Sequence, residues 1–334
     1  MVTDCSTTDT SGVAPATAHC DNSGPVDASD RLSVNLSPSG QRPFLLRNPV
    51  MPASGTFGYG TEYADLVPVE RLGAIVTKGV TRVPWDGNHQ PRLWETASGV
   101  LNSIGLENIG VDAVISEKAP VWATWQVPVM VNIAGHTVDE YAQVARLLDG
   151  VAGVAALEVN ISCPNISEGG LEFGTVPEAA AAVTCAVRQE TELPLIVKLS
   201  PNVTDIVAIA GAVVGAGADA LCLINTLRGT AIDVEKRRFR LGRVAGGLSG
   251  PAIKPVALHM VHLVAHAVAV PVIGCGGIST AADALEFIMA GASAVQVGTA
   301  SFTDARTMLA VIDGLEAYVS RHGLSQLSDI RGIL

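Results

Sequence analysis

The sequence predicts an α/β protein, a (β/α)8 TIM barrel with loop insertions at the C-terminal face of the strands. Two observations carry this prediction. Eight short runs of apolar and β-branched residues recur along the chain, and helical segments lie between most of them, which is the alternation that a parallel barrel requires. Several of the runs lack polar–apolar alternation, as expected of parallel strands that are covered on both faces.

In chain order, the predicted strands are Pro49–Ala53, Ala74–Lys78, Val127–Ile133, Ala155–Ile161, Leu195–Leu199, Ala220–Asn225, Val272–Cys275 and Ala294–Gly298. Helical periodicity is clearest in Val138–Leu148, Pro177–Glu190, Asp205–Ala216, Ile253–Val268 and Thr280–Ala290. Thr137 precedes the first of these helices and Ser279-Thr280 lies at the start of the last. Both are typical helix N-caps.

The chain has 334 residues, of which 48% are hydrophobic, so it can bury an extensive core. We expect one domain over residues 31–334 and a disordered extension over residues 1–30, because the extension is rich in Ser, Thr, Ala, Asp and Gly. It has no Lys or Arg before Arg31, which argues against a secretory signal and an Arg-rich transit peptide. No stretch approaches the roughly 20 apolar residues of a membrane span. These features predict a cytoplasmic protein without a membrane partner.

The formal net charge of −11 argues against an extended nucleic-acid surface. A basic run, Lys236-Arg237-Arg238-Phe239-Arg240, is either a solvated or salt-bridged loop or a surface for docking or an anionic ligand. The cysteines at positions 5, 20, 163, 185, 222 and 275 form no Cys-x-x-Cys pair. We therefore expect no metal or iron–sulfur site in this chain and a reducing compartment.

Glycines follow the last two predicted strands, in Gly274-Cys275-Gly276-Gly277 and in Gly298-Thr299-Ala300. In barrels these two loops commonly bind phosphate, since glycine lets backbone N–H groups approach an anion. The alternative is two tight turns that need glycine for backbone reasons alone. No strand is followed by the Gly-x-Gly-x-x-Gly pattern, which argues against a Rossmann domain.

Polar residues stand where predicted strands end. The fourth strand leads into Asn160-Ile161-Ser162-Cys163-Pro164-Asn165, and this loop composition is poor core material for a thiol that could otherwise be an inert core cysteine. Lys78 and Lys198 lie in apolar strands, so each needs either a structural salt bridge or an anionic ligand. Asn132, Asn160 and Asn225 end three strands and Asn102 lies in a loop; such amides either bind a heterocycle or cap the backbone.

From about Arg31 to its end, the chain resembles the class 1 dihydroorotate dehydrogenases, flavin-dependent barrel enzymes of pyrimidine synthesis. The segments that carry the resemblance follow in family order: Asn48–Gly58, Thr77–Thr81, Asn102–Leu106, Asn160–Asn165 and Gly274–Ile278. Asn225-Thr226-Leu227 and Gly247–Pro255 are most similar to the NAD-linked class 1B. Class 2 enzymes use a serine base and a membrane-associating segment, and both Cys163 and residues 1–30 depart from that pattern.

The resemblance implies oxidation of dihydroorotate to orotate in de novo UMP synthesis. Cys163 would be the base that removes the carbon 5 proton, and FMN would accept the hydride from carbon 6. Lys198 would stabilise negative charge on the reduced flavin, and Lys78 would lie between flavin and substrate. We further expect Gly169 and Gly170 to let the Cys163 loop open and close.

By the same resemblance, the expected substrate-binding residues are Lys78, Asn102, Ser103, Ile104, Gly105, Leu106, Asn160, Asn165, Asn225 and Thr226. The expected FMN-binding residues are Ala53, Ser54, Gly55, Lys78, Asn132, Asn160, Lys198, Ile224, Gly250, Gly276, Gly277, Gly298 and Thr299.

Class 1B further implies a homodimer of this chain, in a heterotetramer with a subunit that carries FAD and a [2Fe-2S] cluster and passes electrons to NAD+. Fumarate as acceptor, in the class 1A manner, is the nearest alternative. A flavin dehydrogenase of another dihydropyrimidine is a second, although tRNA dihydrouridine synthesis would need a basic surface. A non-catalytic barrel that binds a phosphorylated ligand would leave Cys163 and the two lysines unexplained.

Overall fold

The computed structural model describes residues 31–162, 164–165 and 171–334. The extension expected over residues 1–30, Cys163 and the glycines at 169 and 170 lie outside the described residues.

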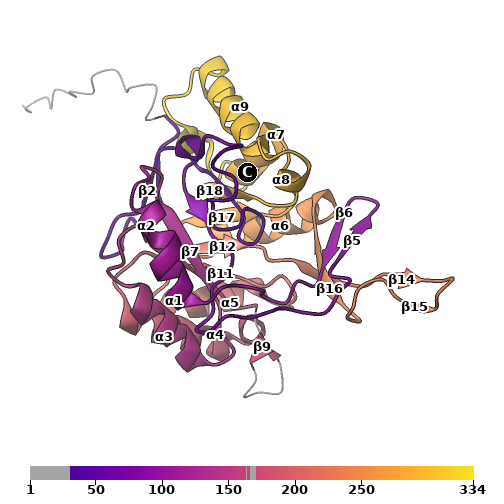
Figure 1. Ribbon diagram of the computed structural model, residues 1–334. Helices are drawn as coiled ribbons and strands as arrows, with labels where there is room; N and C mark the ends of the chain where they lie inside the picture. Colours follow the sequence, from indigo (N-terminus) through magenta and orange to yellow (C-terminus); the bar gives the residue numbers. More distant parts are fainter. Residues whose placement is uncertain (1–30, 163, 166–170) are drawn as a thin grey trace, which may run out of the picture.

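Eight parallel strands form the central sheet (Figure 1). They are β3 Val50–Pro52, β4 Ile75–Val76, β7 Val129–Ile133, β8 Ala156–Asn160, β11 Leu195–Lys198, β12 Ala220–Leu223, β17 Val272–Cys275 and β18 Ala294–Val297. From β4 to β18, each barrel strand pairs with the next one along the chain, and β3 pairs with β18. At the remaining seam, the N–H of Gly73, just before β4, donates to the carbonyl of Val50 in β3 at 2.8 Å. The predicted (β/α)8 barrel is therefore confirmed.

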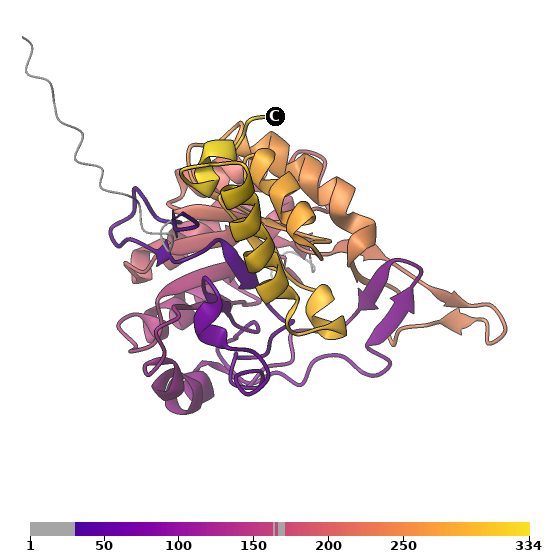
Figure 2. The same ribbon diagram turned by 90° about the horizontal axis from the view of Figure 1, so that it is seen from above.

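Helices surround the sheet, as the two perpendicular views in Figures 1 and 2 show. Their bounds are α1 Val111–Ala113, α2 Ala119–Trp122, α3 Val138–Leu148, α4 Pro177–Glu190, α5 Ile206–Gly215, α6 Lys254–Ala265, α7 Ala281–Met289, α8 Ala300–Thr303 and α9 Thr307–Arg321. A π-helical turn, Val114–Lys118, joins α1 to α2. The predicted helices α3 and α4 have the expected bounds, and α5, α6 and α7 are one to three residues shorter at each end. Several strands are also shorter than predicted at their polar ends, since Lys78 lies outside β4 and Asn225 lies outside β12.

Both predicted N-caps are confirmed. The hydroxyl of Thr137 accepts a hydrogen bond from the Glu140 N–H at 3.2 Å at the start of α3. Thr280 caps α7 in a reciprocal arrangement with Asp283, whose carboxylate accepts from the Thr280 N–H at 2.8 Å. These contacts satisfy N–H groups that have no partner inside the helix.

Loop insertions after the strands form smaller sheets. A four-stranded antiparallel sheet contains β5 Leu93–Thr96, β6 Gly99–Asn102, β13 Leu227–Gly229 and β16 Gly246–Ser249. The hairpin of β14 Ile232–Asp233 and β15 Arg238–Phe239 projects from the barrel beside it (Figure 1). Its basic run is partly salt-bridged, because Arg240 contacts the Asp233 carboxylate at 2.8 Å and lies over the Trp94 ring at 4.2 Å. The docking alternative for this run stays untested.

Two further short pairs complete the described strands: β1 Val34–Asn35 with β2 Leu45–Leu46, and β9 Pro164–Asn165 with β10 Leu171–Glu172. No helix within the described ranges has both the length and the apolar character needed to cross a membrane.

The barrel interior changes character along the strands. Its apolar part, which includes Met130, Ile196 and Ile273, forms one cluster with Phe44 and Leu46 of the β1–β2 segment. Two residues further along the same strands, the interior positions become polar, as with Asn132 after Met130 and Lys198 after Ile196. Because side chains alternate across a strand, each polar residue lies above an apolar one on the same face. The carboxyl end of the barrel is thus the polar end.

Candidate active site

A buried polar layer spans the barrel near the carboxyl ends of the strands. The Glu158 carboxylate of β8 accepts hydrogen bonds from the Asn132 amide at 2.7 Å and from the Gln296 amide at 2.5 Å. The Lys198 ammonium lies 3.9 Å from Glu158 and donates to the Gln296 amide oxygen at 3.2 Å and to the Ser54 hydroxyl at 3.0 Å. Asn132, Glu158, Lys198 and Gln296 are each at most 4% exposed. Every charge in this layer therefore has a partner, as burial requires.

Electrostatics keep this lysine charged. Burial lowers the pKa of Lys198, but the negative charge of Glu158, together with Cys275 and Cys222, outweighs burial and raises the pKa above the ordinary value. Two thiols complete the surroundings, Cys222 of β12 and Cys275 of β17. Burial and a hydrogen bond to Cys275 raise the pKa of Cys222, while that same hydrogen bond lowers the pKa of Cys275. Neither thiol is part of a disulfide.

Above this layer, amide side chains from different strands meet. The Asn225 amide donates to the Asn160 side-chain oxygen at 3.1 Å. The Asn102 amide of β6 donates to the Gly247 carbonyl at 3.2 Å. A Cβ built at Gly247 would lie 2.0 Å from the Thr226 hydroxyl, so Gly247 and Thr226 are in close contact. One series of contacts therefore joins four of the residues expected to bind substrate: Asn102, Thr226, Asn225 and Asn160.

A second series joins residues expected to bind the cofactor. Ser54 contacts Lys198, and a Cβ at Gly298 would lie 3.3 Å from the Ala53 Cβ. The Thr299 hydroxyl donates to the Ser249 hydroxyl at 2.8 Å, beside Gly250. Ile224 joins the same series, because a Cβ at Gly276 would lie 3.5 Å from its side chain.

The two glycine turns have backbone reasons for glycine and also free N–H groups. Gly276 has φ +131° and Gly277 has φ +78°, and a Cβ at either would lie within 2.8 Å of an α6 side chain. Among the described residues, however, the N–H groups of Gly277 and Thr299 have no hydrogen-bond partner. The start of α7 is already satisfied by Asp283. N–H groups without a partner are expected of a turn that binds an anion, and they are not explained by a purely structural turn.

Lys78 differs from Lys198. It is half-buried, and in the described part of the chain its ammonium has no carboxylate within ion-pair distance. The adjacent Gly79 faces Asn132 and Leu106, at 3.0 and 3.4 Å from a built Cβ. Ser103 is 8% exposed, and its hydroxyl is buried without a partner among the described residues. Among the described residues, an ammonium without a carboxylate partner and an unsatisfied buried hydroxyl each fit contact with a bound ligand.

Other expected site residues differ in what the structure describes. Gly105 and Leu106 have φ of +77° and +59°, and Gly105 packs against Asn88. Gly55 faces open space, since a Cβ there would meet no atom within 4 Å. Cys163 lies outside the described residues; for Asn165 the structure gives only the backbone pairing with Leu171.

Two members of the polar layer, Glu158 and Gln296, were not among the residues predicted from the sequence. Both lie within apolar strands, and both are 0% exposed. The signal was present, because the rule applied to the two lysines, that a charge in an apolar strand needs a partner, applies equally to Glu158.

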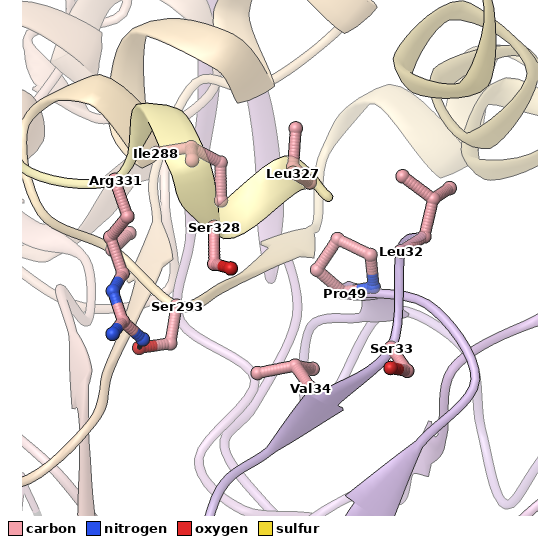
Figure 3. A pocket seen from close by; sticks show the side chains of 10 residues that line it. Leu32, Ser33, Val34, Pro49, Ile288, Ser293, Leu327, Ser328 and Arg331 are labelled. Atoms are coloured by element: carbon pink, nitrogen blue, oxygen red, sulfur yellow. Dashed lines mark hydrogen bonds between the residues drawn. The ribbon is translucent and has the colours of Figure 1, made fainter. Parts of the chain in front are cut away.

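A small cavity lies elsewhere in the barrel. Figure 3 shows it between Leu32, Pro49, Ser293, Leu327 and Arg331, at the amino ends of strands β3 and β18. Its volume of about 20 Å³ holds one water-sized molecule, and Arg331 donates to the Ser293 hydroxyl at 3.0 Å beside it. Barrel active sites lie at the opposite, carboxyl face, so this cavity is not the candidate active site.

Fold and site together define a (β/α)8 barrel protein whose candidate ligand site lies at the carboxyl ends of its strands. The sequence model of the family described as dihydroorotate dehydrogenase matches residues 43–319. The chain belongs to the dihydroorotate dehydrogenase family.

Curated relatives agree over nearly their whole length. A protein of Geotalea daltonii is 57% identical over 303 residues, which cover 91% of this chain and 98% of the relative. Proteins of Geotalea uraniireducens and Geobacter sulfurreducens are 57% and 55% identical over 289 residues, 86% of this chain and 95% of each relative. All three relatives are named dihydroorotate dehydrogenase B (NAD(+)), catalytic subunit.

Proposed function

We propose that this chain is the catalytic subunit of an NAD+-linked dihydroorotate dehydrogenase, which oxidises dihydroorotate to orotate in pyrimidine synthesis. One observation carries the proposal: residues of both contact series, for a heterocycle and for a phosphorylated cofactor, meet at the same end of the barrel. The family match and the names of the relatives support it.

The substrate would occupy the amide-lined part of the site. A pyrimidine ring offers alternating donors and acceptors, which Asn102, Asn160 and Asn225 can match. The substrate carboxylate would take Lys78 as its counter-charge, since that ammonium has no carboxylate partner among the described residues. The loop at Ser103–Leu106 would close around the ring, and the unsatisfied Ser103 hydroxyl would gain a partner there.

The residues present fit FMN. Its phosphate would lie against the free N–H groups of Gly277 and Thr299, with Gly250, Gly276 and Gly298 allowing close approach. Lys198 and Ser54 would contact the pyrimidine end of the ring system, and Asn132 would lie beside it. When bound, FMN supplies the hydride acceptor that the amino-acid side chains lack.

Cys163 would act as the base that removes the proton on carbon 5. The hydrogen on carbon 6 would leave as a hydride, for which the bound cofactor would be the acceptor. A free thiol has a pKa near 8.5, so about a few per cent is thiolate at neutral pH without help. The rate of substrate oxidation should therefore rise with pH until the thiol is fully deprotonated.

The decisive experiment is anaerobic mixing of the purified yellow protein with dihydroorotate while flavin absorbance is followed. We expect rapid bleaching in the wild type and bleaching slowed by at least about a hundred-fold in Cys163→Ser, because serine is a far weaker acid. Protein purified without flavin would contradict the cofactor proposal. Equal bleaching rates in the two proteins would contradict the role of Cys163 alone.

The electron acceptor requires a second experiment. The name of each relative specifies a catalytic subunit, and we propose that a partner subunit with FAD and a [2Fe-2S] cluster passes electrons to NAD+, in a heterotetramer built on a homodimer of this chain. The isolated chain should then reduce an artificial dye but not NAD+. Efficient turnover with fumarate in place of the dye would favour the class 1A alternative.

A further inference from the structure

Glu158 is the negatively charged side chain of the polar layer, and the proposed mechanism does not use it. It lies in β8, two residues before Asn160, and is 0% exposed. Its two carboxylate oxygens are held separately: Asn132 donates to Oε1 at 2.7 Å and Gln296 donates to Oε2 at 2.5 Å. These donors come from β7 and β18, so the carboxylate is fixed from both sides of the barrel.

The Glu158 carboxylate and the Gln296 amide both lie next to the Lys198 ammonium. The ammonium lies 3.9 Å from Glu158 Oε1 and 3.2 Å from the Gln296 amide oxygen. Gln296 therefore contacts both charges, donating to the carboxylate and accepting from the ammonium. The third contact of the ammonium, the Ser54 hydroxyl, lies after β3 at the mouth of the barrel. The ammonium thus lies between a buried anion and the place proposed for the cofactor.

We propose that Glu158 is a positioning residue that acts through Lys198: it holds the lysine ammonium charged and directed at the cofactor, and so sets the redox potential of bound FMN. This inference rests on the proposed function, because it requires that FMN contact Lys198. The residue itself touches neither flavin nor substrate in this proposal. A simple structural role, filling the barrel with a neutral hydrogen-bonding group, is the alternative that the experiment must separate.

The charges that face Lys198 are few. Glu158 on β8, Cys222 on β12 and Cys275 on β17 are the titratable groups that act on it among the described residues. The carboxylate raises the pKa of the lysine against the opposing effect of burial. Without this anion, burial would dominate, and the lysine would release its proton at a lower pH.

The experiment measures the midpoint potential of bound FMN in the holoprotein by anaerobic spectroelectrochemical titration between pH 6 and pH 10. In wild type, Lys198 stays protonated throughout, so it adds no break to the plot of potential against pH. In Glu158→Gln, the negative charge that balances the Lys198 ammonium is lost. The uncompensated ammonium should stabilise reduced flavin, which is more negative than oxidised flavin, so the midpoint potential at pH 6 should be higher than in wild type. A break should then appear where Lys198 deprotonates, and the potential should fall above it.

Two matched variants separate charge from shape. Glu158→Asp keeps the negative charge and should restore the unbroken wild-type plot, whereas a packing role would be damaged by the shorter side chain as well. Adding Lys198→Met to Glu158→Gln should abolish the break, since the titrating group is gone. Should Glu158→Gln not fold, as judged by circular dichroism, Gln296→Met serves instead: it removes the amide that contacts both charges, so the potential should differ from that of wild type, while the plot should stay unbroken because the Glu158 carboxylate remains; an unchanged potential in this variant would contradict the proposal.

The outcomes distinguish the two proposals. A wild-type protein that does not retain FMN overturns the proposed function. A flavin-containing, folded Glu158→Gln variant with the wild-type potential and the wild-type pH dependence overturns the role of Glu158 and leaves the proposed function standing.

Discussion

The side-chain amide of Asn225 donates a hydrogen bond of 3.1 Å to the side-chain oxygen of Asn160, joining the segment after β12 to the end of β8. The same Asn160 oxygen accepts from the Ser162 N–H at 3.2 Å, and the Asn225 oxygen accepts from the Thr226 N–H at 2.8 Å. The orientations of both amides are thus fixed before any ligand binds. Preorganised polar groups of this kind favour a ligand that matches them.

Replacing Asn225 with alanine should lower kcat/KM for dihydroorotate by about ten- to a hundred-fold, because a ligand group and Asn160 both lose a hydrogen-bond partner. Steady-state kinetics with an artificial acceptor measures this. Asn35→Ala is the matched control, since Asn35 caps the backbone of the β1–β2 segment at the other end of the barrel. Equal losses in the two variants would mean that Asn225 has no specific role in the reaction.

The two lysines should respond in opposite ways to replacement by methionine. Lys78→Met should abolish most orotate binding while leaving the free energy of unfolding unchanged or higher, because no carboxylate of the described chain pairs with it. Lys198→Met leaves the Glu158 carboxylate buried without its cation and should cost about 3–5 kcal/mol of stability. Urea unfolding and an orotate titration of the flavin spectrum measure both effects. A large loss of stability in Lys78→Met would point to a structural salt bridge instead of a ligand.

The Asp283 carboxylate at the start of α7 should make the free energy of unfolding depend on pH in the acid range. Burial raises the pKa of Asp283, but hydrogen bonds from Lys254, Ser279 and Thr280 outweigh burial and lower it. A carboxylate with a lowered pKa in the folded state stabilises above its unfolded pKa, and this stability is lost as pH falls through the folded pKa. Asp283→Asn should therefore cost about 1 kcal/mol at pH 7.

Urea unfolding of the wild type and Asp283→Asn between pH 2.5 and pH 7 tests this pH dependence. The difference between the two proteins should shrink toward the acid end. Asp65→Asn, at an exposed aspartate, is the control and should show little difference at any pH. A difference for Asp283→Asn that stays constant down to pH 2.5 would contradict the assigned charge effect.

Glycine replacements should separate the site from the scaffold. Gly276→Ala places a side chain at φ +131° and 2.8 Å from the Ala257 Cβ, which should cost about 1–3 kcal/mol and weaken FMN retention. Gly211→Ala, in α5 with no atom within 4 Å of the new Cβ, should instead add about 0.5–1 kcal/mol. Thermal unfolding and the flavin-to-protein absorbance ratio report the two effects. Full flavin retention in Gly276→Ala would exclude this turn from the cofactor site.

The sequence predicted most of the fold because the barrel repeats one simple unit. Strand β17 and helices α3 and α4 have the bounds that periodicity and capping residues such as Thr137 indicated. The antiparallel sheet of β5, β6, β13 and β16 was not predicted, because short loop strands such as Gly246–Ser249 carry little apolar periodicity and form only through pairing with distant segments.

Polar residues that end an apolar strand could be identified from the sequence, as at Asn160 and Asn225, and the structure brings these two amides into contact; their part in ligand binding stays a prediction. Glu158 and Gln296 were not identified, and they lie inside strands that are apolar on both sides. In such strands, alternation gives no information about which face points into the barrel. Cys163, which the resemblance makes the base, remains a prediction, because it lies outside the described residues.

The order of strands and helices, the glycine turns and the polar groups at the strand ends follow from local preferences along the chain. Local preferences do not specify that Lys198 pairs with Glu158 while Lys78 has no carboxylate partner in the described chain. Closure of the barrel fixes that difference: it brings β8, β11 and β18 around one interior, and the distances between charges on separate strands exist only once the sheet is closed.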